Sequence, residues 1–128
     1  MAERTTYRLG DLQLQIMKVL WRSGPLSVAE VQEALVDQDL AYTTIATMLR
    51  KMEDRGLVRH HESNRKFIYQ AVVAVEEVTR SAADDLVERL FEGRLADAVS
   101  HLLETRDVSV EELTRLEQMI RQRRARNP

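Results

Sequence analysis

The stretch AYTTIATMLRKMEDRGLV, residues 41–58, decides the fold, because its pattern predicts one amphipathic helix that ends at Gly56. The apolar side chains recur at three- and four-residue spacing and form one stripe: Ile45, Met48, Leu49 and Met52. The opposite side carries hydroxyls first and charges later: Thr43, Thr47, Arg50 and Asp54, flanked by Ala46 and Lys51. The apolar stripe predicts burial, so the polar side is expected to be exposed.

This polar side has the composition of a helix face that reads DNA. The second helix of a helix-turn-helix motif enters the major groove, where threonine can bond to a base edge and arginine can hold O6 and N7 of guanine. The candidate groove-facing residues are Thr43, Ala46, Thr47 and Arg50, and the candidate phosphate contacts beside them are Tyr42, Thr44 and Lys51. A solvated helix also shows a polar face, so this helix alone leaves both interpretations open.

Two helices are predicted before this stretch. The first covers residues 11–22, with an apolar stripe at helical spacing, and ends at the SGP of residues 23–25. The second begins after Ser27, which forms a predicted capping box with Glu30, while residues 37–39 break its pattern. The order is therefore three helices, with the polar face on the third.

A hairpin is predicted directly after the third helix. The runs LVRHH and KFIYQAV are rich in β-branched and aromatic residues, and ESNR joins them. The candidate contacts to flanking DNA lie on this hairpin, at or near its basic tip: His61, Arg65 and Lys66. Three helices followed by a hairpin are the layout of a winged helix-turn-helix domain, here residues 1–71, and this layout favours DNA binding over the solvated-face interpretation.

The remaining residues, 72–128, predict three more helices. The first two are separated near Gly93, and Ser109 and Glu112 mark the start of the last. Their apolar stripes are the candidate dimerisation residues: Val78, Ala82, Leu86, Leu90, Leu95, Val99, Leu102, Leu113, Leu116 and Ile120. Packing onto the first helix is the alternative. Because so few residues make a thin core, we expect a second subunit. The expected fold class is mainly α, a winged helix-turn-helix domain followed by an α-helical dimerisation domain.

Charge is distributed unevenly along the chain. The 128 residues carry a net charge of −2, yet between residues 40 and 69 six cationic side chains accompany three acidic ones. A basic segment in an acidic chain indicates a local, directed field rather than a generally adhesive surface.

The sequence predicts neither export nor membrane insertion. No apolar run approaches the ~18 residues of a membrane span. Residues 1–10 lack the apolar core of a signal peptide, and the chain has no cysteine, which excludes disulfides. We therefore expect a cytoplasmic protein.

Catalytic and metal-binding motifs are also missing. The sequence has no helical zinc-protease motif, no phosphate-binding glycine loop and no cysteine nucleophile. His60 and His61 are neighbours in a predicted strand and point to opposite faces, so they do not easily share one ion, and His101 stands alone on a helix. We expect no enzyme activity, no metal site and no cofactor.

Several motifs together resemble the BlaI/MecI penicillinase-repressor family of winged-helix bacterial regulators. They are LGDLQLQIMKVLW, SVAEVQEAL, LAYTTIATMLRKMEDRGLV, the wing RKFIYQ and the C-terminal LADAVSHLLETRDVSVEELTRLEQMI. The resemblance implies a homodimeric repressor on a palindromic operator, commonly with TACA and TGTA half-sites. It assigns DNA reading to residues 42–51 and dimerisation to the last three helices.

The resemblance also implies a mode of induction. In family members a membrane sensor-protease system leads to cleavage at an Asn-Phe pair, and the aligned position here is His101-Leu102. The copper-responsive CopY branch uses C-terminal cysteines, which this chain lacks. The inducing signal therefore stays open. Two alternatives to the repressor remain: a ligand-responsive regulator of the MarR type, and a winged-helix module for protein contacts.

Overall fold

The computed structural model of the protein describes residues 7–127. By its internal contacts the chain divides into two compact units, residues 1–85 and 86–128, which are treated separately below. The predicted division by function, after residue 71, stays a prediction. Residues 1–6, which carry part of the expectation that no signal peptide is present, lie outside the described residues.

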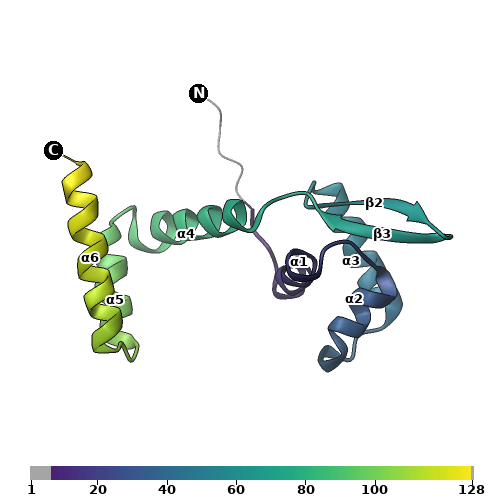
Figure 1. The fold of residues 1–128 in the computed structure, drawn as a ribbon, viewed down its shortest axis with the longest axis horizontal. Coiled ribbons are helices and arrows are strands. Elements are labelled where there is room, and N and C mark those ends of the chain that lie inside the picture. The colour runs from purple at the N-terminus through teal and green to yellow at the C-terminus, as the bar shows by residue number, and fades with distance from the viewer. Residues whose placement is uncertain (1–6, 128) are drawn as a thin grey trace. The chain divides into compact units, whose positions relative to one another are not determined.

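The first unit is a winged helix built from helices and one small sheet (Figure 1). Its elements are α1 (Asp11–Ser23), β1 (Leu26–Ser27), α2 (Val28–Ala34), the short 3-10 helix η1 (Val36–Gln38), α3 (Tyr42–Asp54), β2 (Val58–Ser63), β3 (Lys66–Ala71) and the first part of α4 (Val75–Phe91). The three predicted helices and the hairpin are all present. The helices gather beside the hairpin, whose tip projects beyond them.

The sheet has a third strand that the sequence did not predict. The strand order is β1-β3-β2, and β1 pairs antiparallel with β3 through Leu26 opposite Tyr69 and Ser27 opposite Ile68. A strand of two residues is too short to show the alternation by which strands are predicted. Its effect is to hold the start of α2 against the base of the wing.

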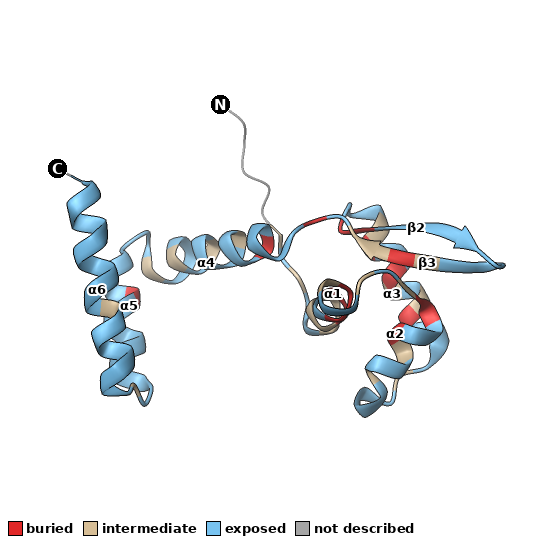
Figure 2. Ribbon diagram, in the orientation of Figure 1, coloured by how far each residue is buried: buried red, intermediate tan, exposed pale blue. Residues whose placement is uncertain are grey.

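Buried residues concentrate where the helices meet the base of the hairpin (Figure 2). The fully buried side chains come from α1, α2, α3, β2 and the residue before β2: Ile16, Met17, Val31, Ile45, Leu49, Met52, Leu57 and Val58. Trp21 packs at the edge of the core and donates its indole N–H to the carbonyl of Val73 at 2.9 Å, which satisfies its only polar group. Both apolar stripes of α1 and α3 are therefore buried as predicted.

The predicted capping box at the start of α2 is present. The hydroxyl of Ser27 accepts the backbone N–H of Glu30 at 3.2 Å, and the carboxylate of Glu30 accepts the backbone N–H of Ser27 at 2.9 Å. Each side chain satisfies an amide that the helix itself leaves without a partner.

The end of α3 fixes the direction of the wing. Gly56 has φ 78°, and its N–H bonds to the carbonyl of Glu53, while the N–H of Leu57 bonds to the carbonyl of Met52. This is the Schellman arrangement, in which the left-handed residue favours glycine and the next residue packs back on the helix. Leu57 and Met52 are both fully buried, so β2 begins from a fixed point on the core.

Most side chains of the second unit are exposed (Figure 2). It contains the end of α4, α5 (Leu95–Thr105) and α6 (Val110–Arg126), with the Ser109 hydroxyl accepting the N–H of Glu112 at 3.1 Å. Ala98 is its buried apolar residue among those described. The large apolar side chains that stay exposed are Leu86, Leu90, Leu95, Val99, Leu102, Leu103, Val110, Leu113, Met119 and Ile120.

Val78 differs from the other predicted dimerisation residues. It is 6% exposed and belongs to the core of the first unit, because α4 begins by packing against that core. In this conformation its side chain is buried in the core of the first unit and cannot contact a second subunit.

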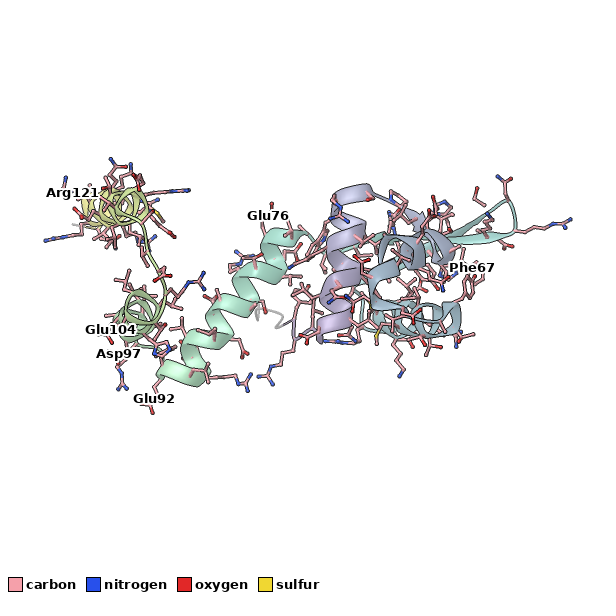
Figure 3. All side chains as sticks on the ribbon, turned by 90° about the horizontal axis from the view of Figure 1, so that it is seen from below. Phe67, Glu76, Glu92, Asp97, Glu104 and Arg121 are labelled. Carbon is pink, nitrogen blue, oxygen red and sulfur yellow. The ribbon has the colours of Figure 1, made fainter. Side chains whose placement is uncertain are left out.

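Two more findings concern the helices. Among residues 7–127, no helix is both long enough and apolar enough to cross a membrane. Helix α6 stays regular through Arg126. Figure 3 labels Arg121 in this last part of α6.

Candidate DNA-binding surface

The outer face of α3 is exposed along its length. The hydroxyl and cationic side chains predicted to contact DNA are all exposed: Tyr42, Thr43, Thr44, Thr47, Arg50 and Lys51. Ala46 is half-buried at the edge of this face, whereas Ile45 and Leu49 on the inner face are fully buried. One side of the helix is therefore buried and apolar and the other exposed and polar, as its sequence pattern predicted.

The same face holds a shallow hollow of about 320 Å³. Its lining residues are Thr43, Thr44, Thr47, Met48 and Lys51. Short threonine side chains create this relief, since a longer side chain at any of their positions would fill it. A surface of this kind allows an approaching base edge or phosphate to come close to the helix.

The cations of the candidate surface are not engaged within the protein. Throughout residues 7–127, the side chains of Arg50, Lys51, Arg65 and Lys66 form no hydrogen bond or ion pair with another residue. Because these charges are not neutralised internally, they remain free to attract an anion such as a phosphate.

Arg55, which the sequence counts in the same basic segment, behaves differently. Its Nη1 donates to Oε1 of Gln13 at 2.9 Å, and its Nη2 donates to the carbonyl of Arg8 at 2.7 Å. Both partners come from the start of the described chain, more than 40 residues away. The basic segment thus includes one arginine that binds the protein itself, a contact between distant residues for which the sequence gives no signal.

The wing has two chemically distinct faces. The β2–β3 register places His60 opposite Tyr69 and His61 opposite Ile68, so alternation along each strand puts the two histidines on opposite faces. This agrees with the reason given for rejecting a shared metal ion. Among residues 7–127, no group of three potential ligands is placed to hold a metal.

His60 faces α3 and is tied to it. The carboxylate of Glu53 accepts the backbone N–H of His60 at 3.1 Å and lies 2.6 Å from Nδ1 of the same residue. The imidazole also packs on Phe67 and Tyr69, with ring centroids 4.5 and 5.3 Å away. Phe67 is labelled in Figure 3. This link between α3 and the wing was not predicted, because a seven-residue separation across a helix end follows no simple pattern.

Tyr69 lies beneath this contact. Burial raises the pKa of the Tyr69 phenol, and the nearby Glu53 carboxylate raises it further, while Arg50 acts in the opposite direction. Tyr69 is 4% exposed and therefore stays a neutral part of the core at the base of the wing.

The tip of the wing is a tight turn between Ser63 and Lys66. Its two central residues, Asn64 and Arg65, have φ 51° and 64°, as the favoured two-residue hairpin turns require. Arg65 and Lys66 are exposed there, and His61 is exposed on the face away from α3. The three predicted wing contacts are therefore accessible, and His61 lies on the opposite face of the hairpin from His60, which contacts Glu53.

The charge of Lys66 affects the pKa of Glu30. The pKa of Glu30 lies below its usual value because the backbone N–H and the hydroxyl of Ser27 bind its carboxylate, and the charge of Lys66 lowers the pKa further.

The N-terminus of α3 has no side-chain cap. Ala41 occupies the N-cap position and offers no side-chain acceptor, in contrast to Ser27 before α2. The N–H groups of a helix start that lack a side-chain acceptor are available to water or to a bound anion. The candidate surface therefore begins at a helix N-terminus that no side chain of the protein caps.

The predicted cleavage position lies inside a helix. His101 and Leu102 are both exposed residues of α5, and the Thr105 hydroxyl donates to the carbonyl of His101 at 2.8 Å. The His101 ring also lies 6.0 Å from that of Phe91. The peptide bond between His101 and Leu102 is thus part of a regular helix.

A trihelical unit with a hairpin wing and an exposed polar third helix defines the winged helix-turn-helix class. Within this class the chain belongs to the penicillinase repressor family, whose family model matches residues 9–122.

Individual relatives support this assignment. The penicillinase repressor of Bacillus licheniformis is 27% identical over 120 residues, which cover 93% of this chain and 94% of that protein. The transcriptional regulator BlaI of Mycobacterium tuberculosis is 35% identical over 100 residues, which cover 76% of this chain and 72% of that protein. The resemblance seen in the sequence motifs is thereby confirmed.

Solved structures give the same fold. The solution structure of the DNA binding domain of the repressor BlaI is similar with a TM-score of 0.50 at 26% identity, covering 59% of this chain and 93% of that one. A mutant MarR of E. coli has a TM-score of 0.50 at 16% identity, covering 75% of this chain and 74% of that one. The second similarity concerns the fold alone.

Proposed function

We propose that the protein is a transcriptional repressor that binds a palindromic operator as a homodimer. The observation that carries this proposal is the outer face of α3, where exposed threonines and unpaired cations surround a shallow hollow. Membership in the penicillinase repressor family and the similarity to the BlaI DNA binding domain support it.

Each part of the surface has a separate role in this proposal. Thr43, Ala46, Thr47 and Arg50 face the base edges of the major groove and supply sequence readout. Tyr42, Thr44, Lys51 and the open N–H groups of α3 contact phosphates and set the register. Arg65 and Lys66 at the tip of the wing bind the flanking backbone, and His61 contributes from the second face of the hairpin.

The second unit supplies the dimer interface. Leu90 and Leu95 are 69% and 64% exposed, and Ile120 is 56% exposed. A set of large apolar side chains with this exposure is unusual for a monomer and fits burial against a second copy. A two-fold symmetric dimer presents two α3 helices and so matches an inverted repeat in DNA.

The geometry of α5 restricts how repression could be relieved. A protease needs an extended segment, whereas the bond between His101 and Leu102 is helical and its carbonyl accepts the Thr105 hydroxyl. Cleavage by a membrane sensor-protease system, which the family resemblance implies, would therefore require α5 to unwind first. The proposed site of action is the cytoplasm, where the operator lies.

A titration of full-length protein against two duplexes tests the proposal. One duplex carries TACA and TGTA arms as an inverted repeat, and the other has the same bases in scrambled order. We expect tighter binding to the inverted repeat by at least about a thousandfold at fixed moderate salt. Equal affinity for both duplexes would refute specific operator binding.

The oligomeric state is measured on the same samples. Light scattering is expected to give a dimer for the wild type. Leu90→Glu places a charge in the proposed interface and is expected to give monomers, whereas Glu92→Gln beside it should leave the dimer intact. A monomeric wild type at operator-binding concentrations would contradict the homodimer.

A further inference from the structure

Residues 7–10 form a strap across the first unit, defined here as the N-terminal strap. At one end the backbone N–H of Tyr7 donates to the Ser81 hydroxyl of α4 at 2.8 Å. The side chain of Arg8 pairs with Asp85 of α4 at 3.3 Å. At the other end the Arg8 carbonyl accepts the Arg55 guanidinium at the end of α3. One short segment therefore contacts both the recognition helix and α4.

Gln13 secures the strap to α1. Its Oε1 accepts the backbone N–H of Gly10 at 3.1 Å and Nη1 of Arg55 at 2.9 Å, and its Nε2 lies 3.5 Å from the Met48 sulfur. The amide thus joins α1, the strap and α3 at a single point. Tyr7 and Leu9 add apolar contacts to the core of the first unit.

Arg55 makes two of the hydrogen bonds in this set. A guanidinium that donates to two neutral acceptors forms charge-assisted bonds, which are stronger than neutral ones. The Arg8–Asp85 pair is more exposed, with the Arg8 side chain 66% accessible, and contributes less. The strap is therefore held mainly by Arg55 at one end and by Ser81 at the other.

Helix α4 continues without a break from Val75 to Phe91. Its first part lies in the unit that carries α3, and its last residues lie in the unit that carries the proposed interface. A constraint on α4 at Ser81 and Asp85 is therefore a constraint on the helix that joins DNA reading to dimerisation.

We propose that Arg55 is a positioning residue that, through the N-terminal strap, fixes α4 relative to the end of the recognition helix. Its charge serves this internal contact and does not serve DNA. A fixed α4 limits the separations that the two α3 helices of a dimer can adopt, so both half-sites of a palindrome are engaged together. This inference rests on the proposed function.

The test compares Arg55→Ala with the wild type on a full palindrome and on a duplex with one TACA half-site. Lys18→Ala is the matched control, because it removes one positive charge from an exposed position on α1. We expect Arg55→Ala to weaken palindrome binding by about tenfold, while half-site binding changes by less than about twofold. The slope of log affinity against log salt should stay unchanged.

Other outcomes of this titration overturn the inference. A slope reduced by about 0.9 with equal losses on both duplexes would mean that Arg55 neutralises a phosphate. No loss on either duplex, or the same loss for Lys18→Ala, would mean that the strap has no positioning role.

Ser81→Ala breaks the strap at its far end. It is expected to lower the ratio of palindrome to half-site affinity in the same direction as Arg55→Ala. The double variant should be no worse than Arg55→Ala alone, since both changes interrupt one connection. Additive losses would show that the two residues act separately and would contradict the strap.

Amide hydrogen exchange separates this inference from the proposed function. Arg55→Ala should speed exchange in residues 75–85 of free protein, a result that needs no DNA. Suppose the wild type does not prefer the palindrome, but Arg55→Ala exchanges faster than the wild type in residues 75–85. The role of Arg55 in the strap is then supported and the repressor proposal is refuted. If the wild type binds its palindrome and exchange is unchanged, the strap fails alone.

Discussion

The Glu53 carboxylate holds His60 at two points, accepting its backbone N–H at 3.1 Å and lying 2.6 Å from its Nδ1. Glu53 is in the last turn of α3 and His60 is in β2, so the contact joins α3 to the wing. The exposed faces of α3 and the wing are thereby held together as one surface.

Removing this contact should loosen the wing. Glu53→Ala leaves the His60 N–H without its acceptor and is expected to lower the free energy of unfolding by about 1 kcal/mol. Urea denaturation of this variant and of the control Asp54→Ala, which removes a neighbouring exposed carboxylate, measures the effect. Equal losses for both variants would show that the pairing with His60 does not matter.

Arg50 is expected to read a base. Arg50→Ala should cost about 1–3 kcal/mol of binding free energy on the cognate palindrome and relax the preference at one base pair in each half-site. Affinities for all single-base variants of one half-site provide the measurement. If binding to cognate and random DNA weakened by the same factor, Arg50 would be a phosphate contact.

Lys66 is expected to bind the backbone. Lys66→Ala should weaken binding to every sequence by a similar factor and reduce the salt slope by about 0.9 for each phosphate released. Titrations from low to moderate salt on cognate and scrambled duplexes measure both quantities. An altered base preference with an unchanged slope would contradict this role.

The Glu30 carboxylate in the cap of α2 should make the stability of the protein depend on pH. The pKa of Glu30 is lowered below the ordinary value of 4.5, so its ionised form stabilises the folded state above that pH. As the pH falls below 4.5 and through the folded pKa, this stabilisation is lost.

Ser27→Ala removes the hydroxyl that contributes to this shift and leaves its largest cause, the backbone N–H of residue 27, in place. We expect it to lower the free energy of unfolding by about 1 kcal/mol at neutral pH through loss of the N-cap. The difference from the wild type should shrink below pH 4.5. Denaturation at a series of pH values checks this. If the difference in free energy of unfolding between wild type and variant increased as the pH fell, the expected direction would be wrong.

The sequence predicted those features that depend on local pattern. Ile45, Leu49 and Met52 follow the helical period, and Ser27 with Glu30 follows a capping rule, so each was found without tertiary information. The two faces of the wing followed from strand alternation at His60 and His61.

Other features depend on contacts between distant residues and could not be predicted. Arg55 is one of the cations of the basic segment in residues 40–69, and no local pattern predicts its hydrogen bonds to Gln13 and the Arg8 carbonyl. Val78 fits the apolar stripe of α4, but a stripe does not say which neighbour covers it, and here the first unit's core does. The assignment of residues to DNA contact and dimerisation stays a prediction.

The most direct test of the central claim, that the outer face of α3 lies in the major groove, uses the absence of cysteine from the sequence. Thr47→Cys introduces a single thiol at the centre of that face, and an attached iron chelate cleaves DNA close to it. Lys18→Cys, on the exposed side of α1, is the control. Two strong, symmetric cleavage sites, one within each half-site, are expected for Thr47→Cys alone. Cleavage outside the half-sites, or equal cleavage from both positions on a duplex that the labelled proteins still bind, would contradict the central claim.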